Sequence, residues 1–235
     1  IVSEVLPFKT NNYVVNELID WDHYEDDPMY ILNFPQKAML KPDRFRNLSR
    51  MIENHASRAE MAKYVNEIRI SLNPHPAGQL EHNVPTLHGE RLTGMQHKYR
   101  ETMLFFPSQG QTCHAYCTFC FRWPQFTGMS ELKFAMKQAD LLVEYLREHP
   151  DITDILLTGG DPMVMKAAVL EKYIDTILDA GLPHLKTIRI GTKALAFWPY
   201  RFLTDKDSEQ IIRVFEKIAN RGVHLAIMAH FSHQR

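Results

Sequence analysis

The chain has 235 residues, of which 45% are hydrophobic and 23% are charged, and its formal net charge is -1. This composition is enough for one sizeable core, and the charge balance gives no electrostatic case for a nucleic-acid partner. No apolar run approaches the roughly 18 residues that span a bilayer. We therefore expect a soluble, globular, cytoplasmic protein that binds neither nucleic acid nor a membrane.

Residues 1–98 predict a mostly helical leader followed by an irregular arm. Pro42 favours the start of a helix. A second helix is expected over 57–70, and residues 73–78, which read Asn-Pro-His-Pro-Ala-Gly, break regular structure. The inner face of the first helix is expected to carry Phe45, Leu48, Met51 and Ile52.

Residues 99–235 alternate between apolar strands and helical periodicity. Strands are expected over 103–106, 155–157, 186–190 and 223–228. Between them, helical spacing runs over 132–146, 170–178 and 211–218, and the last of these helices follows a capping box at 204–207. Parallel strands joined by helices form a doubly wound sheet or a barrel, with functional groups at the carboxyl ends of the strands.

The three cysteines of the chain lie together, as Cys113, Cys117 and Cys120. An odd number of cysteines argues against a closed disulfide framework and favours a metal in a reducing compartment. Thiolates select zinc, Cu(I) or iron-sulfur clusters. A zinc site needs a fourth ligand, such as His114 or a remote histidine, whereas a four-iron cluster held by three thiolates keeps one iron open.

Further polar motifs fall at the ends of the predicted strands. Gly159-Gly160-Asp161 follows the second strand, and in an arbitrary protein this sequence is typical of a turn. Thr192-Lys193 ends the third strand, where an ordinary solvated strand end is the alternative to a binding role. His230 follows the fourth strand, where a metal ligand and an ordinary polar loop residue are both open interpretations.

The Cys-x3-Cys-x2-Cys spacing, with an aromatic residue before the last cysteine, resembles the cluster loop of the radical S-adenosylmethionine (SAM) superfamily. The resemblance implies a [4Fe-4S] cluster whose open iron binds SAM. One electron from the cluster would then cleave SAM to a 5'-deoxyadenosyl radical that abstracts hydrogen from the substrate. The residues that the resemblance places around SAM are Gly159, Gly160, Asp161, Thr192, Lys193 and His230.

A closer resemblance, to the lysine 2,3-aminomutase family, rests on motifs that occur in family order along the chain. They lie at residues 18–28, 94–99, 113–120, 154–161, 188–193 and 230–233. This family moves an amino group between the α and β carbons of an amino acid with the help of pyridoxal phosphate (PLP). The resemblance implies that Arg122 pairs with the substrate carboxylate, a role that suits a guanidinium, and that Tyr99 lies beside PLP.

The chain departs from the family pattern in three places. Thr102 stands where the family has an arginine near the cofactor phosphate, and two extra residues separate Tyr99 from Cys113. The segment after Cys120 is aromatic where the family is rich in arginine. The family lysine that binds PLP lies beyond Arg235, and we expect this chain to be the first part of a longer polypeptide.

We therefore expect an α/β fold, a partial parallel (β/α) radical SAM barrel preceded by a mostly helical N-terminal segment. The favoured function is that of a radical SAM isomerase resembling the amino-acid 2,3-aminomutases, with a small amino-acid-like substrate and a reductant such as flavodoxin or ferredoxin. The alternatives are a PLP-independent radical SAM enzyme and a noncatalytic zinc or iron-sulfur module. A sheet that ends at its fourth strand has an open edge, which further chain or a second subunit must cover.

Overall fold

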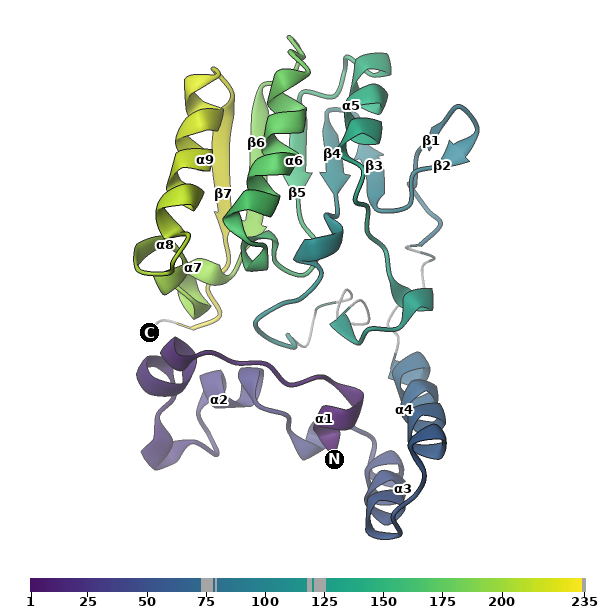
Figure 1. The fold of residues 1–235 in the computed structure, drawn as a ribbon. Helices are drawn as coiled ribbons and strands as arrows, with labels where there is room; N and C mark the ends of the chain where they lie inside the picture. The colour runs from purple at the N-terminus through teal and green to yellow at the C-terminus, as the bar shows by residue number, and fades with distance from the viewer. Residues whose placement is uncertain (73–77, 79, 118–119, 121–125, 234–235) are drawn as a thin grey trace. The chain divides into compact units, whose positions relative to one another are not determined.

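The computed structural model describes residues 1–72, 78, 80–117, 120 and 126–233 (Figure 1). The chain forms two compact units. Unit 1 contains residues 1–76 and 114–133 with Arg235, and unit 2 contains residues 77–113 and 134–234. Unit 1 thus combines the N-terminal segment with most of the cysteine segment, whereas the boundary expected between residues 98 and 99 stays a prediction.

Unit 1 is helical, and local sequence signals explain where its helices begin. Proline occupies the first turn of both α2 and α3, and the Asp27 carboxylate caps α2 by accepting from the backbone N–H groups of Met29 and Tyr30, each at 2.8 Å. A capping box between Ser57 and Glu60 precedes α4. The elements are α1 Val2–Val5, η1 Val14–Leu18, η2 Trp21–His23, α2 Pro28–Asn33, η3 Lys37–Met39, α3 Pro42–Glu53 and α4 Arg58–Leu72.

The core of unit 1 joins its two stretches of chain. Leu48 of α3 is fully buried, but Ile52 is 41% exposed, so the expected inner face of this helix is wrong at its last position. Tyr116, from the cysteine segment, packs against the core and donates from its hydroxyl to the Pro7 carbonyl at 2.9 Å. The buried residues of this core are Val2, Val5, Leu6, Leu40, Leu48, Val65 and Ile68.

Unit 2 is built on a five-stranded sheet in the order β3-β4-β5-β6-β7. Strands β4 to β7 are parallel, and β3 pairs antiparallel with β4. This confirms the α/β class, while closure into a barrel stays a prediction. The strands are β3 Met95–Tyr99, β4 Thr102–Phe105, β5 Asp154–Leu157, β6 Thr187–Thr192 and β7 His224–Ala229, beside a small hairpin of β1 Thr86–Leu87 and β2 Glu90–Arg91.

Three helices cover one face of this sheet, α5 Ala139–Glu148, α6 Ala167–Asp179 and α9 Ser208–Asn220 (Figure 1). Alternate strand residues such as Ile155 and Leu157 are fully buried under them, whereas Leu156 is half-buried. The strand expected to be buried on both faces is therefore buried on one. Shorter elements follow the strand ends, namely η4 Ser108–Gly110, η6 Ser130–Leu132, η7 Pro162–Val164, α7 Ala194–Phe197 and α8 Tyr200–Leu203.

Three expectations about local structure were wrong because tertiary hydrogen bonds compete with local pattern. The helix expected from residue 132 begins at Ala139, since the Met136 backbone bonds to Phe106 and Ser108, each at 2.9 Å, and is extended. Residues 95–99 form a strand within the supposed irregular arm. Asp207 precedes α9 without capping it, because its carboxylate binds Arg201 and the Ala167 N–H.

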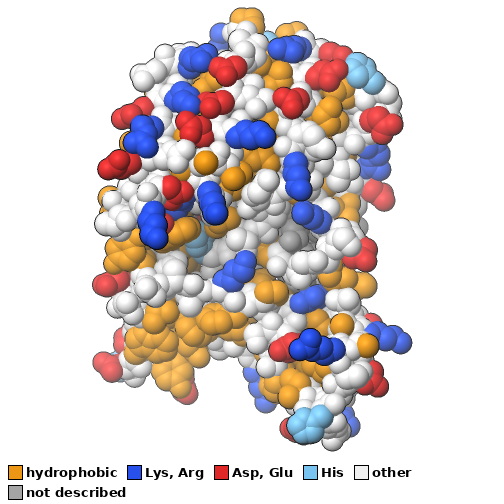
Figure 2. Space-filling view, in the orientation of Figure 1, with side chains coloured by type: hydrophobic (Ala, Val, Ile, Leu, Met, Phe, Trp, Pro, Cys, Tyr) orange, Lys and Arg blue, Asp and Glu red, His pale blue; other side chains and the backbone are white. Residues whose placement is uncertain are grey.

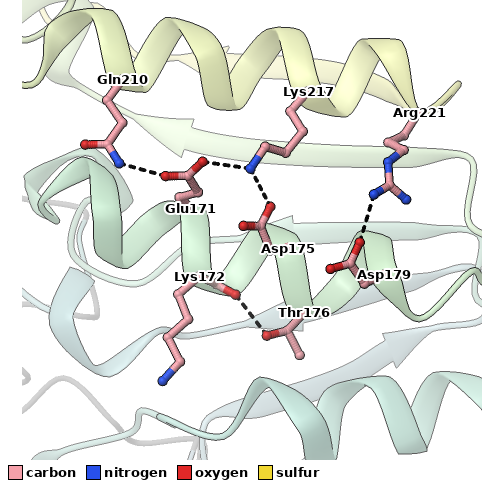
Figure 3. A network of polar contacts seen from close by, with 8 residues as sticks. All are labelled: Glu171, Lys172, Asp175, Thr176, Asp179, Gln210, Lys217 and Arg221. Carbon is pink, nitrogen blue, oxygen red and sulfur yellow. Dashed lines mark hydrogen bonds and ion pairs between the residues drawn. The ribbon is translucent and has the colours of Figure 1, made fainter.

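A ladder of ion pairs links α6 to α9 on the outer surface of unit 2 (Figure 3). Lys217 contacts both Glu171 and Asp175 at 2.7 Å, and Arg221 contacts Asp179 at 2.9 Å. The hydrogen bonds that Lys217 donates to Asp175 and Glu171 raise its pKa. The space-filling view shows acidic and basic side chains interleaved over these helices, as in a solvated face rather than a binding patch (Figure 2).

Candidate functional site

The parallel strands β4 to β7 all end at one edge of the sheet, here called the carboxyl edge. The segment that leads to Cys113 follows β4, Gly159-Gly160-Asp161 follows β5, and Lys193 and His230 follow β6 and β7. The motifs expected at strand ends are therefore brought to the same edge. In parallel sheets this is where loops carry chemistry.

The glycine pair makes room for the start of the cysteine segment. A Cβ atom on Gly159 would lie 2.2 Å from the Gln111 side-chain nitrogen, and one on Gly160 would lie 2.2 Å from the Thr112 carbonyl oxygen. Gly159 also has a φ of +136°, which disfavours any other residue. Contacts with Gln111 and Thr112 therefore already explain why glycine is required at both positions. An approach of SAM to this backbone stays a prediction.

Asp161 connects the ends of β5 and β6. Its carboxylate is 1% exposed and accepts from the Met163 N–H at 2.9 Å, the Thr192 hydroxyl at 2.7 Å and the Lys193 N–H at 2.7 Å. Three donors to one buried carboxylate hold it in a single orientation. Asp161 therefore fixes the backbone on which Gly159 and Gly160 lie.

The side chain of Lys193 differs from its neighbours in having no hydrogen-bond partner. Its Nζ is buried, lies 5.9 Å from the Phe197 ring centre, and has no acceptor within the described part of the chain. His230 directly follows β7, and its backbone N–H donates to the Thr192 carbonyl at 2.9 Å. Burial and, secondly, the charge of Lys193 lower the pKa of His230, which favours the neutral imidazole.

Gln111 also belongs to the carboxyl edge, although no sequence pattern pointed to it. The residue is 8% exposed and lies against Gly159. Its Nε2 donates to the Pro107 carbonyl at 2.9 Å, while its Oε1 is buried and accepts from no group in the described residues. Its position two residues before the first cysteine is the one signal that would have drawn attention to it.

Arg201 was likewise missed, and it holds the segment that follows Asp161. This arginine of α8 is 2% exposed, donates to the carbonyls of Met163 and Met165 at 2.9 and 2.7 Å, and forms a close ion pair with Asp207. Burial, the largest single effect, acts to raise the pKa of Asp207, but the hydrogen bonds from Arg201 and the Ala167 N–H, together with the charge of Arg201, hold that pKa below its ordinary value. The loop after the glycine pair is thereby anchored to α8 and α9.

None of the three cysteines, all of which the structure describes, forms a disulfide. Cys113 is half-buried in unit 2, whereas in unit 1 Cys117 is buried, Cys120 is half-buried, and the Cys120 N–H donates to the Cys117 carbonyl at 2.9 Å. Among the described residues, no three His, Cys, Asp or Glu side chains are gathered as ligands of a metal ion. The donor set itself fits a cluster held by three thiolates, because the chain offers three cysteines and no fourth.

Unit 1 also contains a cavity of about 380 Å³ beside Cys117. Tyr116 and Cys117 line it together with apolar residues of the N-terminal segment, among them Leu6, Ile31 and Met39. One buried thiol therefore has a mainly apolar wall at its side, of the kind that excludes water from a metal centre.

One predicted residue, Tyr99, is not brought to this edge. Tyr99 pairs with Thr102 at the opposite, amino edge of the parallel strands and is 56% exposed. Beside it, Thr102, Asp154 and Arg189 bond to one another across three strands. Arg122 lies outside the described residues.

Comparison with known proteins gives relatives of one kind. No family model matches the chain. The chain is 30% identical over all of its 235 residues to a protein of Aquifex aeolicus named "Putative L-lysine 2,3-aminomutase", of which it spans 50%. It is 36% identical over 112 residues, 48% of this chain and 22% of the relative, to the L-lysine 2,3-aminomutase of Bacillus subtilis.

A third relative, the L-lysine 2,3-aminomutase of Acetoanaerobium sticklandii, is 32% identical over 108 residues, which are 46% of this chain and 25% of that protein. The chain thus spans at most about half the length of these relatives. Within the described residues, no helix has the length and apolar character needed to cross a membrane. The chain is therefore similar to proteins named lysine 2,3-aminomutase, in agreement with the resemblance that its motifs predicted.

Proposed function

We propose that the protein is a radical SAM isomerase that moves an amino group within an amino-acid substrate. The observation that carries this proposal is the arrangement of the carboxyl edge, where the segment leading to Cys113 lies directly on the glycine pair after β5. The similarity to lysine 2,3-aminomutases along the whole chain supports the same reading. When bound, the cluster and SAM supply a 5'-deoxyadenosyl radical that removes a hydrogen atom from the substrate.

The residues of this chain would hold and orient these groups. Cys113, Cys117 and Cys120 would be the cluster ligands, and the backbone of Gly159 and Gly160 would face the amino group of SAM. Asp161 would act by fixing that backbone, because its carboxylate already accepts three hydrogen bonds. The residues proposed to contact the carboxylate, ribose or adenine of SAM are Thr192, Lys193 and His230.

The substrate and partners follow from the family resemblance. Arg122 would pair with the carboxylate of a small amino acid, Tyr99 would lie beside PLP, and a flavodoxin or ferredoxin would supply the electron. We place the protein in the cytoplasm. The outer edge of β7, where Met228 is 48% exposed, would be covered by further chain or by a second subunit.

The proposal is tested with full-length protein reconstituted anaerobically with iron and sulfide. About four irons per chain are expected, with 5'-deoxyadenosine released when a reductant and SAM are added. Replacing Cys117 by serine should abolish both, whereas Ser130→Ala, an exposed change in unit 1, should affect neither. Colourless protein that binds zinc and leaves SAM intact would instead identify a noncatalytic module.

A second candidate is a radical SAM enzyme that works without PLP. One observation favours it, since the Thr102 hydroxyl, which replaces a family arginine near the cofactor phosphate, donates to Asp154 at 2.8 Å and is engaged within the protein. The absorption band of bound PLP in the full-length protein distinguishes the two candidates. Activity in PLP-free enzyme, with no change on adding PLP, would reject the aminomutase reading.

A further inference from the structure

The buried polar atoms at the carboxyl edge that have no hydrogen-bond partner within the described residues include two on either side of the glycine pair. They are Oε1 of Gln111 and Nζ of Lys193. Buried polar groups in folded proteins are almost always hydrogen-bonded, so each unpaired one needs a reason. These two have opposite character, because one accepts hydrogen bonds and the other is a cation that donates them.

The orientation of the Gln111 amide follows from its neighbour. Its nitrogen faces the Pro107 carbonyl at 2.9 Å, and a carbonyl accepts hydrogen bonds only. Turning the amide over would place two oxygens in contact and break that bond. The free group of Gln111 is therefore its oxygen.

The two unpaired groups flank the glycine pair. Gln111 lies on Gly159 from the β4 side, and the backbone of Lys193, on the β6 side, donates to Asp161 at 2.7 Å. Strand β5 runs between β4 and β6 in the sheet. An acceptor on one side and a cation on the other thus bracket the proposed position of SAM.

This pair matches the two charges of an α-amino acid. An ammonium needs acceptors, and a carboxylate pairs with a lysine cation. We propose that Gln111 is a binding residue for the amino-acid end of SAM, with its Oε1 accepting from the ammonium while the carboxylate lies towards Lys193. The inference rests on the proposed function and adds to it a residue and an orientation of the ligand.

The test measures binding without reduction, so that no turnover is needed. Full-length, cluster-loaded protein is dialysed to equilibrium against SAM, and in parallel against 5'-methylthioadenosine, which lacks the amino-acid end. Gln111→Met keeps the size of the side chain but removes the amide oxygen. We expect SAM affinity to fall about tenfold, the loss of one hydrogen bond to a charged group, with unchanged affinity for methylthioadenosine.

Two further variants separate binding from structure. Gln111→Glu keeps an acceptor but loses the donation to Pro107, so it should retain SAM affinity if the oxygen is what matters. Gln109→Met is the matched control, because the Gln109 oxygen already accepts from the Tyr173 hydroxyl at 2.7 Å. It should lower stability and leave SAM affinity unchanged.

The outcomes distinguish this inference from the proposed function. Wild-type protein that does not bind SAM rejects the proposed function itself. Wild-type protein that binds SAM while Gln111→Met binds it equally well overturns the inference alone. Equal losses for SAM and methylthioadenosine, or for the Met and Glu variants, also overturn it, because they identify Gln111 as a structural residue.

Discussion

The two edges of the sheet in unit 2 treat their polar side chains differently. At the amino edge, the Asp154 carboxylate accepts hydrogen bonds from the Thr102 hydroxyl and the Arg189 guanidinium. All three residues are half-buried. At the carboxyl edge, the Asp161 carboxylate is hydrogen-bonded as fully as that of Asp154. The Gln111 oxygen and the Lys193 Nζ at the same edge, however, are buried without a hydrogen-bond partner in the described part of the chain. Among the described residues, the Thr102, Asp154 and Arg189 side chains satisfy one another, whereas the Gln111 oxygen and the Lys193 Nζ retain capacity for hydrogen bonds.

This difference agrees with the ligand site that we propose at the carboxyl edge. An unpaired buried group lowers stability by about 1–3 kcal/mol, so a protein retains it only where something else compensates. The surrounding anchors, Asp161 and Arg201, hold the backbone in place while leaving those two groups unpaired. Rigid support around unsatisfied groups is what a preorganised binding site requires.

The largest effect should come from the anchor of the carboxyl edge. Arg201→Ala removes a buried cation, the ion-pair partner of Asp207 and the donor to two carbonyls. We therefore expect the free energy of unfolding to fall by about 4 kcal/mol. Urea denaturation measures it. The control Lys217→Met removes the two ion pairs of the half-buried Lys217 in Figure 3 and should cost about 0.5 kcal/mol. Similar losses in both variants would contradict an anchoring role.

Next in size is the effect of adding a methyl group at the glycine pair. Gly160→Ala places a Cβ against the Thr112 backbone, which cannot yield without moving the segment before Cys113, and should cost about 3 kcal/mol. Gly191→Ala on β6 meets no atom closer than 3.8 Å and should change stability by less than about 0.5 kcal/mol. Thermal unfolding compares them, and a harmless Gly160→Ala would show that the close contact is absent in solution.

Exchanging each edge carboxylate for an amide sharpens the comparison directly. Asp161→Asn turns an acceptor into a donor that faces other donors in a buried site, and should cost about 2 kcal/mol. Asp154→Asn makes the same change at the half-buried amino edge, where water can compensate, and should cost about 1 kcal/mol. The free energies of unfolding of the two variants, measured at the same pH, show which substitution destabilises the protein more. A larger loss for Asp154→Asn would contradict the stronger hydrogen bonding that we expect at Asp161.

The smallest effect concerns pH. Burial and Lys193 lower the pKa of His230 below its ordinary value of 6.5, so the unfolded chain takes up a proton that the folded chain resists. The contribution of His230 therefore lowers the free energy of unfolding as the pH falls below about 6.5. Above that pH, the imidazole is neutral in both states and contributes no change. His230→Gln should remove roughly 0.5 kcal/mol of the difference in stability between pH 7 and pH 5. Identical pH profiles for wild type and variant would disprove it.

Sequence pattern predicted many of the helices and strands, because in those segments the local signals agree with the burial of the side chains. Pro42, the apolar periodicity of α6 and α9, and the four parallel strands all appear within a few residues of their expected places. The three cysteines, the glycine pair and the motifs at the strand ends were also found from sequence alone. Spacing sufficed for them, because their chemistry depends on residue type and on the strand that precedes them.

Other features were decided by the tertiary structure alone. The extended course of residues 133–138 depends on backbone bonds to Phe106 and Ser108, and the pairing of Arg201 with Asp207 joins α8 to the start of α9, with no pattern that indicates it. Gln111 reads as an ordinary polar residue, and only its position on Gly159 reveals that its oxygen is buried without a donor. The sequence thus determined which groups are present and near which strand. Packing decided which of them are already satisfied, because hydrogen-bond partners distant in sequence are fixed only when the chain has folded.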